Sequence, residues 1–288
     1  MTRVLRSVVA AIGVAGCSWD APPIEWQAPA PVASRVDTAA QFTARLELGA
    51  GGATPTVVVA ASDSTGGAGG DSSATVVSAT TEVAACAGSW ARAAQVRGSR
   101  WSAWWKIRTD SSAVLIAEQS DSSGAITQRI TVDSLDRASV GCARPAPAIA
   151  VDSINGYVHI GYFMVAPEGP GLFYAHLMDA RLQRFETPLA IVYGEKPVRV
   201  AVASRGDTVA VVYEDPNSEV GRIAMSVSLT GGHLFEQTAR LIPVSTSSQQ
   251  ASAPQIVRLS AGHLWVGWRE QSQSGSAFLV RRARIVSR

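Results

Sequence analysis

The chain has 288 residues, 47% of them hydrophobic, which is enough for a substantial buried core. Lysine and arginine together number 25, against 23 for aspartate and glutamate, so the chain lacks the large positive charge with which proteins bind polyanions. Its basic residues gather only at the end of the last predicted strand, where we expect a solvated edge: Arg281, Arg282, Arg284 and Arg288. The composition therefore excludes nucleic acid as a partner.

Residues 1–16 have the pattern of an export signal. Arg3 and Arg6 precede an apolar run over residues 8–16, about half of the roughly 18 residues that a membrane-spanning helix needs. The run ends in Val14-Ala15-Gly16-Cys17, which resembles the bacterial lipobox. In that motif a signal peptidase cuts before a cysteine that carries diacylglycerol, so the resemblance implies a mature chain anchored to a membrane through Cys17. An ordinary secretory leader followed by an unrelated cysteine is the alternative.

The residue after this cysteine bears on location. Ser18 stands where an aspartate would favour retention at the inner membrane. Without Arg3 and Arg6, the mature chain has equal numbers of basic and acidic residues. We therefore expect a lipid-anchored protein of the bacterial cell envelope, at the outer membrane or on the periplasmic face.

Two further cysteines, Cys86 and Cys142, remain if Cys17 is acylated. An even pair of cysteines in an exported chain predicts a disulfide between them. Two separate buried thiols are the alternative, because the sequence does not show that the two Cα atoms approach each other.

Residues 17–40 predict a tether between the anchor and a folded domain. Proline removes backbone donors and holds the chain extended, and alanines fill much of the rest. The four prolines are Pro22, Pro23, Pro29 and Pro31. Trp19 and Trp26 fit either the lipid interface or a contact with the domain, and the sequence does not choose between them.

From residue 41 to residue 288, strand-like apolar runs recur in one frame. Their final positions are spaced about 50 residues apart, a period typical of stacked supersecondary units. These positions are Ala61, Trp105, Tyr162, Tyr213 and Trp268. Residues 41–288 are therefore predicted to form one domain built from repeats.

Each unit is predicted to contain three or four antiparallel strands. In the last three units a strand opened by proline, at Pro147, Pro197 or Pro254, precedes the aromatic run. Short turns containing Gly98, Gly156, Gly206 or Gly262 join these two strands, and further apolar strands follow. With almost no helix-period segment, this pattern predicts an all-β fold, a β-propeller of four to five four-stranded blades. An irregular β-sandwich is the alternative.

The last unit lacks a fourth strand of its own. An open edge strand invites pairing with other chains, and closed propellers often cover it with a strand from the N-terminus. We therefore expect a strand from within residues 33–48 to complete the last blade.

The segment Ser228-Leu-Thr-Gly-Gly232-His-Leu-Phe235 follows a third strand. It resembles the Asp-box turn of the sialidase-like propellers, Ser-x-Asp-x-Gly-x-x-Trp, with Thr230 in place of the aspartate. Ser120-Asp-Ser-Ser-Gly124 is a more distant match. The resemblance implies the propeller scaffold but carries over no catalytic residue, because no Arg-Ile-Pro signature is present and Arg240-Leu-Ile-Pro243 has an extra residue.

Charged residues follow the second strand of several units. In an up-and-down blade the exit of the second strand and the entrance of the first lie on one face of the ring, so these residues should gather there with the three prolines. They predict a candidate ligand rim made of Lys106, Arg108, Glu214, Asp215, Arg269 and Glu270. Solvated loop ends without a chemical role are the alternative.

No metal or cofactor site is predicted. The spacing of the four histidines, His159, His176, His233 and His263, is not typical of metal ligation, and no nucleophile elbow or phosphate-binding loop is present. Tryptophans on two second strands fit either a sugar-stacking platform or packing between blades. Of these two alternatives we expect the packing. They are Trp101, Trp104, Trp105, Trp265 and Trp268.

Two function classes fit these observations. The first, which we favour, is a membrane-anchored propeller that binds a protein or a glycan through one ring face without catalysis. The second is a divergent sialidase-like glycoside hydrolase, in which two carboxylates of the rim act as acid and base. The absence of a recognisable catalytic set favours the first.

Overall fold

The computed structural model of the chain describes residues 24–31, 42–48, 55–61, 91–93, 96, 98–235, 242–246, 248–260 and 262–285. These residues form almost only β-strands, with a single 3-10 turn, η1 (Ala180–Leu182), as the helical element among them. No helix in this part of the chain has the length and apolarity needed to cross a membrane. The predicted leader of residues 1–16, Cys17 and Cys86 lie outside the described residues.

The strands form four antiparallel sheets, which we call blades 1 to 4, and one two-stranded sheet. Blade 1 contains β5 (Ala91–Arg92), β6 (Arg100–Ile107), β7 (Ala113–Ser120) and β8 (Ile126–Asp133). Blade 2 contains β9 (Ala148–Val151), β10 (Val158–Ala166), β11 (Gly169–Leu177) and β12 (Leu189–Tyr193). Blade 3 contains β13 (Val200–Arg205), β14 (Thr208–Glu214), β15 (Ile223–Ser228) and β16 (Ile242–Pro243).

Blade 4 combines the last strands of the chain with two from its beginning. It contains β17 (Gln250–Ser260), β18 (His263–Ser272), β19 (Gly275–Ile285), β1 (Ile24–Trp26) and β2 (Ala30–Pro31). The two-stranded sheet pairs β3 (Phe42–Leu48) with β4 (Pro55–Ala61).

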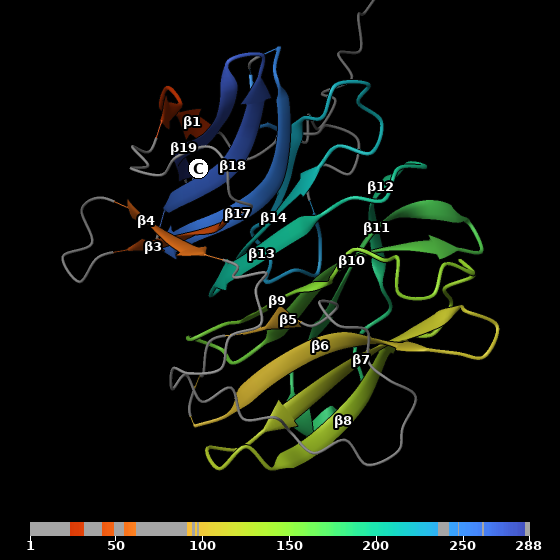
Figure 1. The fold of residues 1–288 in the computed structure, drawn as a ribbon. Helices are drawn as coiled ribbons and strands as arrows, with labels where there is room; N and C mark the ends of the chain where they lie inside the picture. The colour runs from red at the N-terminus through yellow and green to blue at the C-terminus, as the bar shows by residue number, and fades with distance from the viewer. Residues whose placement is uncertain are drawn as a thin grey trace, which may run out of the picture.

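The blades are arranged as in a β-propeller. Within blades 1 to 3 the strands follow chain order, and in blade 4 the N-terminal strand β1 comes after β17, β18 and β19. The first strands of successive blades contact one another: β5 with β9, β9 with β13, and β13 with β17. Figure 1 shows the blades in succession from blade 1, in yellow, to blade 4, in blue, with the β3–β4 pair beside β17. Neighbouring first strands are the inner edges of blades, whereas a sandwich would stack sheet faces. The predicted fold class is confirmed.

Blade 4 is completed by an N-terminal strand, but not by the one expected. Ile24 pairs with Ile285 and Trp26 with Ala283, so β1 lies outside β19 as the fourth strand, and β2 also pairs with β19. The strand within residues 33–48 that the structure describes, β3, pairs with β4 instead. Residues 24–31 therefore belong to blade 4, and the predicted tether over residues 17–40 is wrong for them.

The basic residues of β19 hold this N-terminal strand. The Arg281 guanidinium lies 4.7 Å from the centre of the Trp26 ring, and its Nε donates to the carbonyl oxygen of Gln27 at 2.9 Å. Arg284 Nε lies 3.3 Å from Glu25 Oε2. Trp26 thus docks on the domain. Arg281 and Arg284, which were expected on a solvated edge, instead contact the N-terminal segment that covers this edge. Arg282 lies over the Trp265 ring, and Arg288 lies outside the described residues.

The aromatic residues at the ends of the second-strand runs occupy equivalent buried positions. Each faces the third strand of its blade and is at most 1% exposed: Trp105 opposite Leu115, Tyr162 opposite Phe173, Tyr213 opposite Ala224 and Trp268 opposite Leu279. The rings of Trp105 and Tyr162 meet edge to face with centroids 6.0 Å apart, which joins blade 1 to blade 2. Trp101 and Trp104 are also buried, so these side chains form packing contacts and not an exposed sugar-stacking platform.

A glycine lets two blades approach closely. Gly161 lies on β10, and a Cβ atom at this position would lie 2.9 Å from Val202 Cγ2 on β13. A larger residue would push blade 3 away from blade 2, because real Cβ atoms do not approach other atoms this closely.

Cys142 is disulfide-bonded. It is the sole cysteine among the described residues, so its partner lies outside them, and the pairing with Cys86 stays a prediction.

The buried hydroxyl of Tyr162 gives a test of the inter-blade core. It donates to Asp133 Oδ2 at 2.6 Å, and both residues are buried. Replacing Tyr162→Phe leaves that carboxylate oxygen without its donor, so we expect the free energy of unfolding to fall by about 1 to 3 kcal/mol. Urea denaturation of the full chain measures the change. Tyr193→Phe, at a tyrosine that is 50% exposed, is the control, and equal stability of the two variants would contradict the assignment.

Candidate functional site

A pocket of about 1020 Å³ lies where blades 2, 3 and 4 meet. It is lined by residues 143–147 before β9, by residues 196–200 at the entrance of β13, by residues between 214 and 221 after β14, and by residues 250–255 of β17. The lining therefore combines entrances of first strands with the exit of a second strand, as the predicted rim requires. Pro147, Pro197 and Pro254 all line it.

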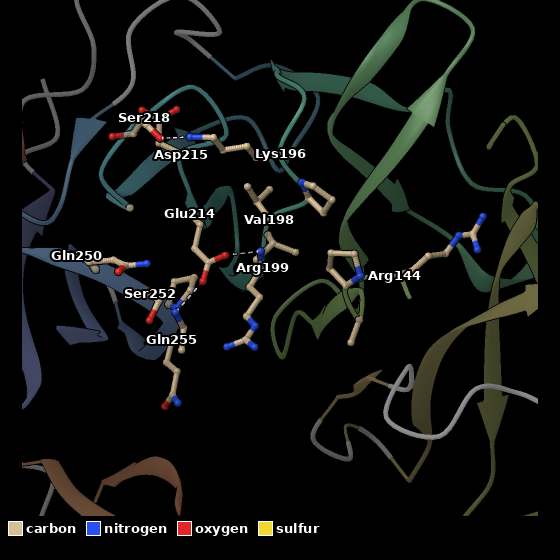
Figure 2. Close-up of a pocket in the computed structure, with 18 of the residues that line it drawn as sticks. Arg144, Lys196, Val198, Arg199, Glu214, Asp215, Ser218, Gln250, Ser252 and Gln255 are labelled. Carbon is tan, nitrogen blue, oxygen red and sulfur yellow. Dashed lines mark hydrogen bonds between the residues drawn. The ribbon is translucent and has the colours of Figure 1, made fainter. Parts of the chain in front are cut away.

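Glu214 links two blades across the pocket wall. One carboxylate oxygen, Oε2, accepts the backbone N–H of Arg199 in the same blade at 3.1 Å. The other, Oε1, accepts the backbone N–H of Ala253 in blade 4 at 2.9 Å (Figure 2). Both oxygens are thus engaged by main-chain donors, so this carboxylate sets the shape of the pocket.

The donor from blade 4 comes from a bulge. The pairing of β17 with β18 shifts between Ser252 and Gln255, and Ala253 has a φ of 53°, a conformation that alanine rarely adopts. Pro254 lies within this bulge, where no ladder donor is lost. The bulge turns the N–H of Ala253 out of the ladder and toward Glu214.

Three cations line the pocket, and they differ in how they are held. Arg144 is buried and paired with Asp136, and Figure 2 shows its guanidinium directed away from Glu214 and Arg199. Lys196 Nζ donates to the carbonyl oxygen of Ser218 at 2.7 Å. Arg199 is exposed, and no described residue accepts a hydrogen bond from its guanidinium. Arg199 is therefore the pocket cation whose side-chain donors no described residue occupies.

The other pocket carboxylates are Asp215 and Glu219. Asp215 Oδ1 accepts the backbone N–H of Asn217 at 3.0 Å and so caps the turn after β14. Together with Gln250, Gln255 and Ser252, these groups give the pocket both donors and acceptors, and none of the described residues that line it is aromatic. Such a surface can hydrogen-bond a hydroxyl-rich ligand but offers it no ring to stack on.

Of the six residues of the predicted rim, Glu214 and Asp215 line the pocket. Lys106 and Arg108 lie on blade 1, where Arg108 Nη2 donates to the carbonyl oxygen of Ser134 at 2.9 Å. Arg269 and Glu270 lie on β18, paired with Ser252 and Ala251 but outside the pocket lining. Glu270 Oε2 accepts the indole N–H of Trp268 at 3.2 Å.

Sequence reasoning missed the residues at the entrances of the first strands. Lys196 and Arg199 flank Pro197, the predicted start of a strand. Because the strand-opening prolines are predicted to lie on the rim, charged residues beside them can be predicted there as well. Residues 250–253, which precede the predicted strand opening at Pro254, are not found in this way, because the bulge around Ala253 has no pattern of its own in the sequence.

The histidines give a second group of polar side chains. Their spacing in the sequence predicts no metal ligation, yet the structure brings His176 and His233 together with Glu186, with one ligand atom of each within 4.8 Å of the others. This group lies between blades 2 and 3, away from the pocket lining.

No known family model matches the chain, and no curated protein matches it either. The chain is similar to solved structures at low identity. The phage phi92 endosialidase is 9% identical over 69% of this chain and 36% of that chain, with a TM-score of 0.48. A PL25 ulvan lyase is 10% identical over 61% and 43%, with a TM-score of 0.42. The Bacillus subtilis arabinanase Arb43A is 13% identical over 64% and 69%, with a TM-score of 0.37.

The bridge made by Glu214 predicts a loss of stability on neutralisation. Glu214→Gln replaces one acceptor oxygen by an NH₂ group that faces a backbone N–H, so we expect the free energy of unfolding to fall by about 1 to 3 kcal/mol. Chemical denaturation monitored by tryptophan fluorescence measures it. Asp215→Asn is the control, because asparagine keeps the carbonyl oxygen that Asn217 needs, and it should change stability by less than about 0.5 kcal/mol. If the Glu214→Gln chain is as stable as the Asp215→Asn chain, the Glu214 bridge does not stabilise the fold.

Proposed function

We propose that this chain is an exported, lipid-anchored propeller that binds a glycan in the pocket between blades 2, 3 and 4 and does not catalyse its cleavage. The observation that carries the proposal is the mixed hydrogen-bonding surface of a pocket of about 1020 Å³, with the Arg199 guanidinium open to a ligand. That volume is at the upper end of the range for small-molecule sites, and it accommodates more than one sugar ring.

The polar lining favours a ligand rich in hydroxyl groups. A hydroxyl both donates and accepts, and the pocket sets amide and guanidinium donors beside carboxylate acceptors. Protein interfaces are enriched in aromatic anchor residues, and the described lining residues of the pocket include prolines, alanines and valines but no aromatic side chain. The proposal therefore commits to a glycan.

The engagement of Glu214 argues against hydrolysis. Glycoside hydrolysis needs a pair of carboxyl groups of which one is protonated and meets the leaving oxygen. Both oxygens of Glu214 accept backbone N–H groups, one from blade 3 and one from blade 4, so this side chain is held in the pocket wall. This carboxylate is therefore suited to positioning and not to acid catalysis.

Arg199 gives the direct test of glycan binding. The full chain, purified in detergent, is applied to an array of neutral and sialylated oligosaccharides, and the affinity for each hit is measured by calorimetry. We expect Arg199→Gln to weaken binding by about tenfold or more, because a charge-assisted hydrogen bond contributes roughly 1.5 to 3 kcal/mol. Arg181→Gln is the matched control, since Arg181 is 90% exposed beside Asp179 on η1 and lies outside the pocket.

Four outcomes would contradict the proposal. The first is that no oligosaccharide binds, and the second is that Arg199→Gln and Arg181→Gln affect binding equally. The third is release of a new reducing end from a bound oligosaccharide, which would make the chain a glycoside hydrolase of the sialidase-like kind. Binding of a protein ligand alone would also count against the glycan.

The lipid anchor is part of the same proposal and rests on the resemblance of Val14-Ala15-Gly16-Cys17 to the lipobox. We expect the chain expressed in a Gram-negative host to incorporate labelled palmitate and to partition into the detergent phase, because several acyl chains hold a protein firmly at a membrane. Cys17→Ser should abolish both properties, and Ser18→Ala should keep the label. A wild-type chain that is secreted without label would instead indicate an ordinary leader.

A further inference from the structure

Three side chains from two blades converge at the end of the strands that lies away from the pocket. His176 lies near the end of β11, Glu186 follows η1, and His233 lies in the turn after β15. Pro147, before β9, lines the pocket, whereas Val158 pairs with Leu177 and with Val151 at the far end of β9. The two histidines and the glutamate are therefore on the opposite side of the propeller from the proposed glycan site.

The distances among these side chains match a first-row metal site. His176 Nε2 lies 3.4 Å from Glu186 Oε2, and His233 Nδ1 lies 3.6 Å from the same oxygen. All three ligand atoms lie within 4.8 Å of one another. Tetrahedral Zn²⁺ with bonds of about 2.0 to 2.1 Å holds its ligand atoms about 3.3 Å apart. A small adjustment of the two exposed side chains would place all three on one ion.

The buried histidine supplies independent support. The His176 side chain is 3% exposed, and its Nε2 makes no hydrogen bond with any described residue although Glu186 lies nearby. A buried polar atom without a partner costs about 1 to 3 kcal/mol, so native structures rarely keep one without a reason. Coordination of a cation by this nitrogen would give it a partner.

The surroundings of the three side chains are aromatic on one side and acidic on the other. The His159 ring stacks on His176 with ring centroids 6.2 Å apart. Glu186 is the acidic member of the group and supplies a negative charge to the site.

The backbone fixes two of the three ligands. The N–H of Glu186 donates to the carbonyl oxygen of His176 at 3.0 Å. His233 follows Gly232, which has a φ of 96° and lies so close to Tyr174 that a Cβ atom would be 1.9 Å from the phenol oxygen. Ser228 Oγ accepts the N–H of Gly232 at 3.1 Å and closes this turn. The turn that resembles an Asp box thus sets the position of His233.

We propose that His176, Glu186 and His233 bind one divalent transition-metal ion, Zn²⁺ first among them, with water in the remaining position. Two imidazoles and one carboxylate are a common ligand set for zinc with an open fourth site. Glu186 and His233 are 41% and 43% exposed, so the ion has a path from solvent. The ion would link blade 2, which carries His176, to the turn after β15 of blade 3.

The test measures zinc binding by the full chain, purified without a histidine tag and treated with a chelator. Competition with a chromophoric chelator and elemental analysis after dialysis give the affinity and the stoichiometry. We expect one equivalent of Zn²⁺ and a rise in melting temperature with Zn²⁺. Glu186→Gln and His233→Ala, both at half-exposed side chains, should each weaken Zn²⁺ affinity by at least about tenfold and remove the thermal shift. Co²⁺ in place of Zn²⁺ should give visible d–d absorption that both variants lose.

His263→Ala is the matched control, because His263 lies on β18 outside this group. It should bind Zn²⁺ like the wild type. The proposal is overturned if the wild type retains no zinc after dialysis, or if Glu186→Gln and His233→Ala retain as much as His263→Ala. Because the group lies away from the pocket, loss of zinc in these variants should leave oligosaccharide binding intact, so the two proposals fail separately.

Discussion

The fold depends on middle strands that are buried on both faces. In β14 every residue from Val209 to Tyr213 is fully buried, and in β10 all residues from Val158 to Met164 are buried. A strand with one solvated face would alternate buried and exposed residues. Burial on both faces means that each such sheet needs a neighbour on either side, and successive blades provide it. The cores accordingly lie between adjacent sheets, where Trp105 meets Tyr162 and Phe163 packs with Val211.

Near the pocket, hydrogen-bonded carboxylates hold the segments that the apolar cores do not. Asp136 follows β8 and pairs with Arg144, which lines the pocket, and its two oxygens also accept the backbone N–H groups of Ala113 and Val165. The half-buried Glu214 likewise accepts backbone N–H groups from blades 3 and 4. Because fixed main-chain donors hold both carboxylates, these residues keep the segments around the pocket in place.

The two ends of the blades thus carry different chemistry on one scaffold. The pocket end is rich in main-chain turns, carboxylates and one available guanidinium, which suits recognition of hydroxyl groups. The other end gathers imidazoles and aromatic rings, with His159, Tyr174 and His176 stacked between blades 2 and 3. Both sites lie between blades, because the side chains that form them come from segments that only the packing of separate sheets brings together.

Much of the architecture follows from local pattern. The repeat period, the apolar runs and the glycine turns predict most strands of blades 1 to 4, because apolar runs and turn chemistry act within a few residues. Local sequence pattern says less about which strands pair when they lie far apart in the chain. The sequence predicts that an N-terminal strand completes blade 4 but not that it begins at Ile24, since that choice depends on the fit of Trp26 beneath Arg281.

By itself, the sequence determined the all-β repeat fold, the face of the ring on which the strand-opening prolines gather, and the resemblance of its first 17 residues to an exported, acylated leader. The tertiary structure alone decided that Glu214 is held by two blades, that Arg199 remains available, and that His176, Glu186 and His233 meet. The physical reason is that turn and strand preferences act between residues close together in the chain. These contacts join segments of different blades, and only the packing of the blades sets their distances.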